Sequence, residues 1–357
     1  MSNQRIRDGL LNTGVMASLA AAALFGLGTP VAKSLLASVD PWLLAGLLYG
    51  GSGIALTAVR LVRPRSRGKL VPSELGYLAG AVAAGGVAGP VLLMFGLSMM
   101  PAAGASLLLN AEGVFTALIA WLVFRENVDR RIAFGMFAIA AGAFLLSWSP
   151  GLRAQQLWPS LLVLGACAAW AVDNNLTRKL SLLDATWLAS VKGIFAGATN
   201  LAIALLIGAS WPSVAHMSGA LVVGALAYGA SLVLFVVGLR HLGAARTTAY
   251  FSTAPFVGAL IAILWLHEPV TLQLLIAAGL MVLGLWLHLT ERHEHEHLHT
   301  DLEHEHEHVH DEHHLHEHET PVAPGTRHAH RHRHVTLRHT HAHFPDAHHQ
   351  HGHGHDG

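Results

Sequence analysis

The feature that most constrains this chain is an internal repeat. The segment Leu118–Glu126 reads LIAWLVFRE and the segment Leu260–Glu268 reads LIAILWLHE, so five of the nine positions are identical. The same offset of 142 residues aligns Gly96 with Gly238. Self-similarity at a fixed spacing is the sequence signature of a duplicated structural unit. We therefore expect the first half of the hydrophobic region to recur as the second half.

The composition is that of an integral membrane protein. Of the 357 residues, 52% are hydrophobic and 12% are charged, whereas soluble domains carry roughly 25% charged residues. The apolar residues lie between positions 14 and 290, and residues 291–357 are almost wholly polar. The sequence contains no nucleophile elbow, phosphate-binding glycine loop or nucleic-acid patch. It therefore predicts neither an enzyme nor a nucleic-acid partner.

Ten segments are long and apolar enough to cross a bilayer, which takes about 20 residues of helix. The predicted fold is an all-α integral membrane protein with ten transmembrane helices. The expected spans are Gly14–Leu36, Trp42–Val62, Leu75–Leu97, Ala102–Phe124, Ile132–Trp148, Leu157–Leu176, Ala185–Ile207, Ser218–Leu239, Ala244–Leu266 and Val270–Leu289.

The basic residues predict the orientation of these spans. With the N-terminus inside, the inner segments hold fourteen Lys and Arg residues, and the outer loops and helix ends hold only Lys33 and Arg153. Because Lys and Arg accumulate on the cytoplasmic side, we expect an inner (plasma) membrane protein with both termini in the cytoplasm.

The spans divide into two groups of five. The expected organisation is a cytoplasmic N-terminus at residues 1–13, five-helix repeats at 14–149 and 157–290, and a cytoplasmic tail at 291–357. Since five is odd, the second repeat would enter the membrane inverted relative to the first. Inverted repeats are typical of secondary transporters; a duplicated structural bundle without transport is the alternative.

The repeats resemble a known family. Each fourth span closes on a glutamate, Glu126 or Glu268, and the segment Phe25–Lys33 (FGLGTPVAK) is similar to a first-helix motif that ends in lysine. Trp170–Lys179 (WAVDNNLTRK) holds the equivalent place in the second repeat. Over Val15–Leu289 the chain resembles the EamA-type permeases of the drug/metabolite transporter superfamily. The resemblance implies a transporter of small solutes. From their position, we expect both glutamates to cap or anchor the turn into the next helix.

Polar residues within the spans are the candidate translocation site, because ionisable groups in a membrane usually face a cavity or a partner. Glu112 is interpreted as a proton or cation site, with a buried structural carboxyl as the alternative. Asp173 and Lys192 lie at compatible depths and are expected to form an ion pair, either a gate or a neutralised structural pair. The candidate set is Asn110, Glu112, Asp173, Asn174, Asn175 and Lys192.

The tail is rich in histidine. The stretch from His293 to His355 holds 24 of the 28 histidines, many of them alternating with glutamate, and it has almost no apolar content. Such a segment is expected to be disordered. Imidazole suits Ni²⁺, Co²⁺, Zn²⁺ and Cu²⁺. The predicted metal-binding residues are His293, His295, His297, His299, His304, His306, His308 and His310.

Three functions are compatible with these features. The favoured hypothesis is export of a transition-metal cation such as nickel or cobalt, with the tail collecting metal. The second is export of amino acids, metabolites or drugs, with the tail as a metal buffer or sensor. The third is a membrane metal sensor that does not transport. The expected partners are the lipid bilayer and a small solute or metal ion, with a proton as coupling ion, no required cofactor, and a homodimer as one assembly that the sequence allows.

Overall fold

The computed structural model describes residues 13–62, 70–124, 130–148, 154–180 and 183–289 of the hydrophobic region. In the tail it describes residues 294–299, 302–308, 328–334 and 337–342. The chain forms two compact units, residues 1–291 and 292–357, which are considered separately. The predicted cytoplasmic N-terminus, Glu126, His293 and His310 lie outside the described residues.

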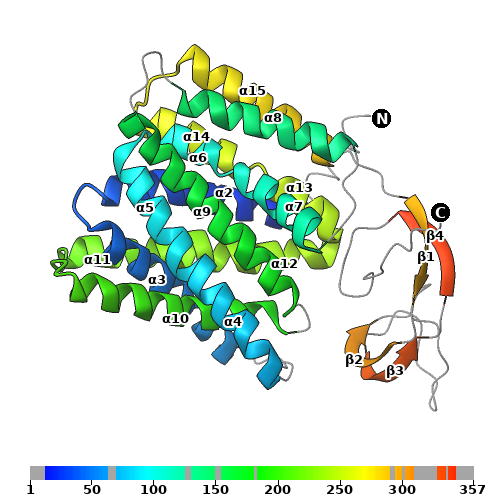
Figure 1. Cartoon of the computed structure of the whole chain (residues 1–357). Helices are drawn as coiled ribbons and strands as arrows, with labels where there is room; N and C mark the ends of the chain where they lie inside the picture. Colours follow the sequence, from blue (N-terminus) through cyan, green and yellow to red (C-terminus); the bar gives the residue numbers. More distant parts are fainter. Residues whose placement is uncertain are drawn as a thin grey trace. The chain divides into compact units, whose positions relative to one another are not determined.

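The described part of the hydrophobic unit consists of helices joined by short non-helical connections (Figure 1). Helices are the expected solution in lipid, because each backbone group finds its partner within the same segment. The elements are α2 (Thr13–Leu35), α3 (Pro41–Val62), η1 (Pro72–Glu74), α4 (Leu75–Ala81), η2 (Val82–Ala88), α5 (Gly89–Met99), α6 (Ala102–Leu108), α7 (Ala111–Phe124), α8 (Arg130–Ser147), α9 (Ala154–Arg178), α10 (Ala185–Leu206), α11 (Val214–Val223), η3 (Gly224–Ala230), α12 (Ser231–Leu242), α13 (Ala244–Phe251), α14 (Ala254–Trp265) and α15 (Leu272–Leu289).

Nine helical segments of this described part are long and apolar enough to cross a membrane. They correspond in order to the first nine predicted spans. The predicted spans Leu75–Leu97 and Ala102–Phe124 are separate, because α5 ends at Met99 and Pro101 precedes α6. In place of a tenth full-length span the described residues give a shorter apolar helix, Leu272–His288. The count of ten therefore stays a prediction.

Interruptions recur at equivalent places in the two halves. The π-helical turn η2 covers residues 82–88 and η3 covers 224–230, an offset of 142. The predicted fourth and ninth spans were expected to be continuous, but they break at Leu109–Asn110 and at Ser252–Thr253. Breaks and π-helical turns free backbone carbonyls, which a membrane tolerates where neighbouring side chains satisfy them. The duplication thus extends to the irregular positions.

Helices α3 and α10 pack closely, as Figure 1 shows in its lower part. The contact is made by glycines: a Cβ added to Gly53 would lie 2.5 Å from the backbone nitrogen of Ile194, and one added to Gly197 would lie 2.6 Å from that of Gly50. Small residues at a crossing let two backbones approach, which is how helices associate in lipid. The crossing joins a helix of the first half to a helix of the second.

Two adjacent glycines of α3 provide a test of this packing. An added Cβ at Gly51 would lie 2.2 Å from the carbonyl oxygen of Leu221 on α11, whereas one at Gly50 meets nothing within 4 Å. We expect Gly51→Ala to destabilise the protein by about 1–3 kcal/mol or more, as overpacking does, and Gly50→Ala to leave stability unchanged. Thermal unfolding of both variants in detergent measures this. Equal unfolding temperatures would contradict the α3–α11 contact.

The tail contains four short strands, β1 (Glu294–His299), β2 (Leu302–His308), β3 (His328–His334) and β4 (Leu337–Ala342). β1 pairs with β4 and β2 pairs with β3, both antiparallel. The alternation of His with a second polar residue has the period of two that suits a strand. The predicted disorder of residues 291–357 stays a prediction.

Candidate functional site

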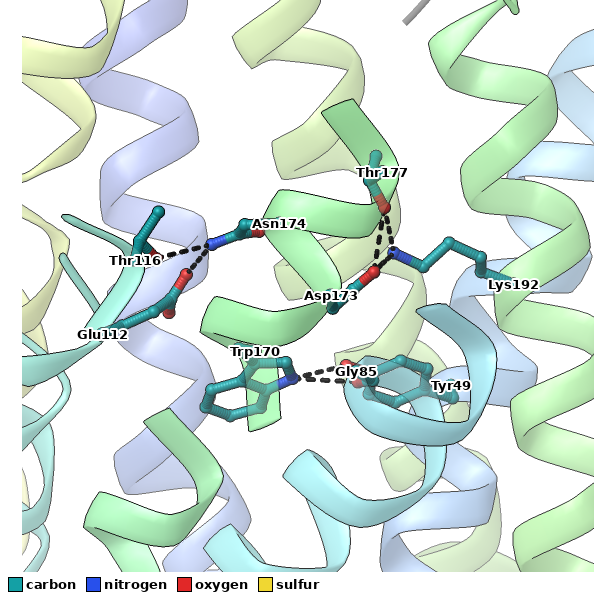
Figure 2. Close-up of polar contacts among 9 residues, drawn as sticks. All are labelled: Tyr49, Gly85, Glu112, Thr116, Trp170, Asp173, Asn174, Thr177 and Lys192. Atoms are coloured by element: carbon teal, nitrogen blue, oxygen red, sulfur yellow. Dashed lines mark hydrogen bonds and ion pairs between the residues drawn. The ribbon is translucent and has the colours of Figure 1, made fainter. Parts of the chain in front are cut away.

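An ion pair joins α9 and α10 within the helical unit. The Lys192 ammonium donates to both carboxylate oxygens of Asp173, at 2.5 and 2.6 Å, and to the Thr177 hydroxyl at 3.3 Å. The Thr177 hydroxyl in turn donates to Asp173 at 2.9 Å. Figure 2 shows Lys192 reaching across to this face of α9. Asp173 is 7% exposed, so both charges are held largely away from water.

The ion pair lies on the wall of a cavity of about 360 Å³ that draws residues from both halves of the chain. Five of the other thirteen residues that line the cavity are aromatic. Successive ring centroids lie 5.7, 5.7, 5.3 and 5.0 Å apart along the series, so the rings form a continuous surface. In that order the rings belong to Tyr49, Tyr228, Phe25, Phe251 and Phe235.

The π-helical turn η2 supports the cavity from behind. It frees the carbonyl of Gly85, which accepts hydrogen bonds from the Tyr49 hydroxyl and the Trp170 indole, each at 2.9 Å (Figure 2). Glycine is needed at this position, because an added Cβ would lie 1.9 Å from a carboxylate oxygen of Asp173. The next carbonyl, that of Gly86, accepts from Asn200 at 3.0 Å. The backbone irregularity thus positions Tyr49 and leaves space for Asp173.

Glu112 lies on the opposite side of α9 from the ion pair (Figure 2). Its carboxylate accepts a hydrogen bond from the Asn174 amide at 2.8 Å, and the same amide lies 3.5 Å from the Thr116 hydroxyl. Glu112 lies in the first turn of α7, the helix that follows the break at Leu109–Asn110. Because Asp173 and Asn174 are consecutive, one turn of α9 contacts both charged groups.

Another set of contacts closes the end of the bundle where α2 ends. The Glu268 carboxylate accepts from the backbone nitrogens of Ala102 and Ala103, at 2.6 and 2.7 Å, and so caps α6. The ammonium of Lys33 donates to the carbonyls of Leu97 and Ser98, at 2.7 and 3.2 Å. A carboxylate at a helix N-terminus is stabilised by the helix dipole. Glu268 thus caps α6, whereas the sequence led us to expect a cap or anchor at the turn into the next helix, α15.

This arrangement can be compared with known proteins. The model of the EamA-like transporter family matches the chain twice, over residues 12–148 and over residues 157–290. The chain belongs to the EamA-like transporter family. It is therefore a multi-pass membrane transporter and not an enzyme, as the sequence predicts.

Individual relatives of this EamA-like protein agree with the family assignment. An uncharacterized transporter of Methanothermobacter thermautotrophicus is 27% identical over 292 residues, which cover 77% of this chain and 85% of the relative. The uncharacterized transporter YvbV of Bacillus subtilis is 23% identical over 274 residues, or 73% of this chain and 85% of that protein. A solved crystal structure, 17% identical, has a TM-score of 0.58 and covers 77% of this chain and 96% of its own. That likeness concerns the fold alone.

The structure places four of the six predicted site residues in the two charged clusters of this EamA-like protein. Asp173 and Lys192 form the expected ion pair in the cavity wall, and Asn174 bonds to Glu112. Their roles in transport stay predictions. The other two residues bond mainly to backbone: the Asn110 amide donates to the Leu107 carbonyl, and the Asn175 amide donates to the carbonyls of Ala171 and Thr116. Neither is among the residues that line the cavity.

Sequence reasoning missed the aromatic wall of the cavity. Its five rings come from four different helices and one π-helical turn, so no local motif joins them. Phe25 lies within the segment that resembles the family's first-helix motif, and this was the one available signal.

Among the side chains that the structure describes, no group of three or more His, Cys, Asp or Glu residues could hold a metal ion. Six of the eight histidines predicted to bind metal lie in the tail strands, at positions 295, 297, 299, 304, 306 and 308. Metal binding by the tail therefore stays a prediction.

Proposed function

We propose that this EamA-like transporter moves a small organic solute that carries both a positive and a negative group, such as an amino-acid-like zwitterion. One observation supports this most: the Lys192–Asp173 pair faces a cavity whose wall also contains five aromatic rings. A zwitterion would exchange partners with the ion pair, its carboxylate on Lys192 and its ammonium on Asp173. Its apolar part would then lie against the rings, since an aromatic wall favours burial of apolar surface.

The cavity suits an organic solute better than a transition metal, which was the first hypothesis from the sequence. A divalent cation needs several oxygen or nitrogen ligands. Among the described residues that line the cavity, the one carboxylate is neutralised by an ammonium, which would repel the cation. Metal efflux stays the second candidate function, because the tail is rich in histidine.

The transport cycle we propose is alternating access between two inverted repeats. The cavity extends along α9 toward Thr177 and along α10 toward Ala185. Thr177 is next to Arg178 in the sequence, and the charge pattern assigns Arg178 to the cytoplasmic side. The Glu268 and Lys33 contacts lie at the end assigned to the outside. The conformation described is thus consistent with a cavity open to the cytoplasm, from which an exporter loads its solute.

We further propose that Glu112 carries the coupling proton. It is a carboxyl within a membrane span, and α9 connects it to the cavity through consecutive residues, with Asn174 on Glu112 and Asp173 on Lys192. A proton that arrives at Glu112 would weaken its hold on Asn174 and bias the position of this turn of α9. Protonation of Glu112 would in this way affect the Lys192–Asp173 ion pair through α9, without one residue that contacts both groups.

Counterflow into proteoliposomes tests the proposed solute. Vesicles that contain the purified full-length protein are preloaded with a mixture of unlabelled amino acids, and uptake of each labelled amino acid is compared with uptake of Ni²⁺ and Co²⁺. We expect saturable counterflow of a zwitterion with an apolar side chain. Tyr228→Ala should raise its KM by about tenfold or more, because a buried ring is lost.

The matched control is Phe195→Ala, which removes a ring that is 61% exposed on α10. It should leave KM unchanged. Accumulation of Ni²⁺ or Co²⁺ above the level of empty vesicles, with no exchange of any organic solute, would favour metal efflux and contradict the proposal.

A further inference from the structure

The residues that line the cavity include five with a hydroxyl group, and these hydroxyls differ in what they bond to. The five are Tyr49, Ser52, Thr177, Tyr228 and Ser231. Three of them donate to other groups of the protein, at 2.8 or 2.9 Å: Tyr49 to the carbonyl of Gly85, Thr177 to the carboxylate of Asp173, and Ser231 to the carbonyl of Ala21. The hydroxyls of Ser52 and Tyr228 have no hydrogen-bond partner among the residues that the structure describes. Since a hydroxyl away from water needs a partner, these two indicate contact with the solute.

Ser52 is the more unusual of the two residues, because it is only 6% exposed. A serine or threonine within a helix can donate to the carbonyl four residues earlier, as Thr57 of the same helix does to Gly53 at 2.7 Å. For Ser52 the carbonyl at that position belongs to Leu48. Gly224 of η3 packs against this carbonyl so closely that an added Cβ would lie 2.0 Å from its oxygen. The Ser52 hydroxyl is therefore a buried polar group in the cavity wall that its own helix does not satisfy.

Ser52 lies next to the elements that carry Lys192 and Tyr228. Helix α10 touches α3 directly after Ser52, where an added Cβ on Gly193 would lie 2.7 Å from the Cα atom of the following residue. Gly193 is adjacent to Lys192 in the sequence. The π-helical turn η3 touches α3 at Ser52 itself, because an added Cβ on Gly229, adjacent to Tyr228, would lie 3.6 Å from the Cα atom of Ser52. The packing of α3 thus brings the two hydroxyls and the ammonium to one part of the cavity wall.

We propose that the hydroxyls of Ser52 and Tyr228 form, together with Lys192, the subsite that binds the carboxylate of the transported zwitterion. This inference rests on the function proposed above and adds the hydrogen-bond donors that such a solute needs. A carboxylate has about four lone-pair sites that accept hydrogen bonds, and the Lys192 ammonium already donates to Asp173 and Thr177. Because a carboxylate away from water is costly unless it is fully bonded, donors besides the ammonium are required.

The position of Ser52 decides which charged group of the solute it serves. A hydroxyl can donate to a carboxylate or accept from an ammonium. Helix α3 packs directly on α10, which carries Lys192, so the group placed near Ser52 is the one that Lys192 attracts. The solute class is then an amine that also carries a carboxylate. A simple amine or a metal cation lacks the group that these donors bind.

Removal of single hydroxyls tests the subsite in the full-length protein, by counterflow of the amino acid that the native protein exchanges fastest. Ser52→Ala and Tyr228→Phe each remove one hydroxyl, and the phenylalanine keeps the ring. We expect each change to raise the KM of that amino acid by about tenfold or more, the effect of losing one hydrogen bond to a charged group. The matched control is Ser231→Ala, which removes a cavity hydroxyl that already donates to a backbone carbonyl. It should change KM by less than about twofold.

Two analogues of the same amino acid assign the hydroxyls to the carboxylate. Competition with counterflow is measured for the acid that lacks the amino group and for the amine that lacks the carboxyl group. Ser52→Ala should raise the inhibition constant of the acid by about tenfold or more and leave that of the amine unchanged. A loss of folded protein would lower the maximal rate and would change neither constant.

The outcomes separate the subsite from the function on which it rests. An equal rise for the acid and the amine, or a native KM for the amino acid in both Ser52→Ala and Tyr228→Phe, would overturn the carboxylate subsite and leave the proposed function intact. A native protein that exchanges no amino acid would instead contradict the proposed function, and the subsite with it.

Discussion

Solute transport by the Lys192→Met variant is expected to fall by about 100-fold or more, because the change removes a solute-binding group and leaves a buried carboxylate without its partner. In the native protein both oxygens of Asp173 accept from the Lys192 ammonium. Asp173→Asn should have a similar effect for the opposite reason, since it leaves the ammonium without its counter-ion. Counterflow in proteoliposomes measures the loss for each variant.

The double variant Lys192→Met/Asp173→Asn separates binding from folding. Removing one partner of a buried ion pair strongly destabilises a protein, whereas replacing both charged residues is often neutral for stability. We expect the double variant to recover the unfolding temperature of the native protein and to remain inactive. Recovery of transport together with stability would show that the pair is structural, and the proposed zwitterion site would then be wrong.

A second ion pair supplies the control. Arg60 bonds to Asp184 at the junction of α3 and α10, and neither residue is among those that line the cavity. Asp184 also caps α10 through the backbone nitrogen of Trp187, and asparagine is an equally good cap. The variant Arg60→Met/Asp184→Asn should therefore keep both stability and transport.

The order of the spans and one tertiary contact could be predicted from the sequence. Apolar segments of the right length predict spanning helices, because lipid offers the backbone no other partner. Asp173 and Lys192 could be matched because two opposite charges at similar depth in a membrane need each other. Pro101 stands directly before α6, between the predicted spans that end at Leu97 and begin at Ala102.

Other features depend on contacts between distant segments and left no local signal. The π-helical turn η2 contains no proline, and its sequence continues the helical pattern, so its freed carbonyl is evident only beside Tyr49 and Trp170. A single aromatic residue within an apolar span has the same pattern whether it faces lipid or a cavity. Glu268 lies 166 residues from Ala102 in the sequence, so its role as the cap of α6 could not be predicted from its own turn.

Glu112→Gln is expected to abolish proton-driven accumulation while solute exchange continues. Glutamine keeps a carbonyl oxygen that can accept from Asn174, at present 2.8 Å from the carboxylate, so the fold should be preserved. It cannot carry a titrating proton. With a pH gradient across the vesicle membrane, uphill accumulation should fall by about 100-fold or more, in the range by which a positioned proton-transfer group acts. Counterflow at equal pH should remain near the native rate.

The difference between these two measurements is what identifies coupling. If Glu112 had only a structural role, its replacement would lower uphill accumulation and counterflow together, because less folded protein would remain. If Glu112 bound the solute, its replacement would raise the KM of counterflow. The variant Thr116→Val removes the hydroxyl that lies 3.5 Å from the Asn174 amide without changing any charge, and it should retain both activities. Uphill accumulation by Glu112→Gln at the native level would place the coupling proton elsewhere and leave Glu112 with the structural role of holding Asn174 and its turn of α9 in place.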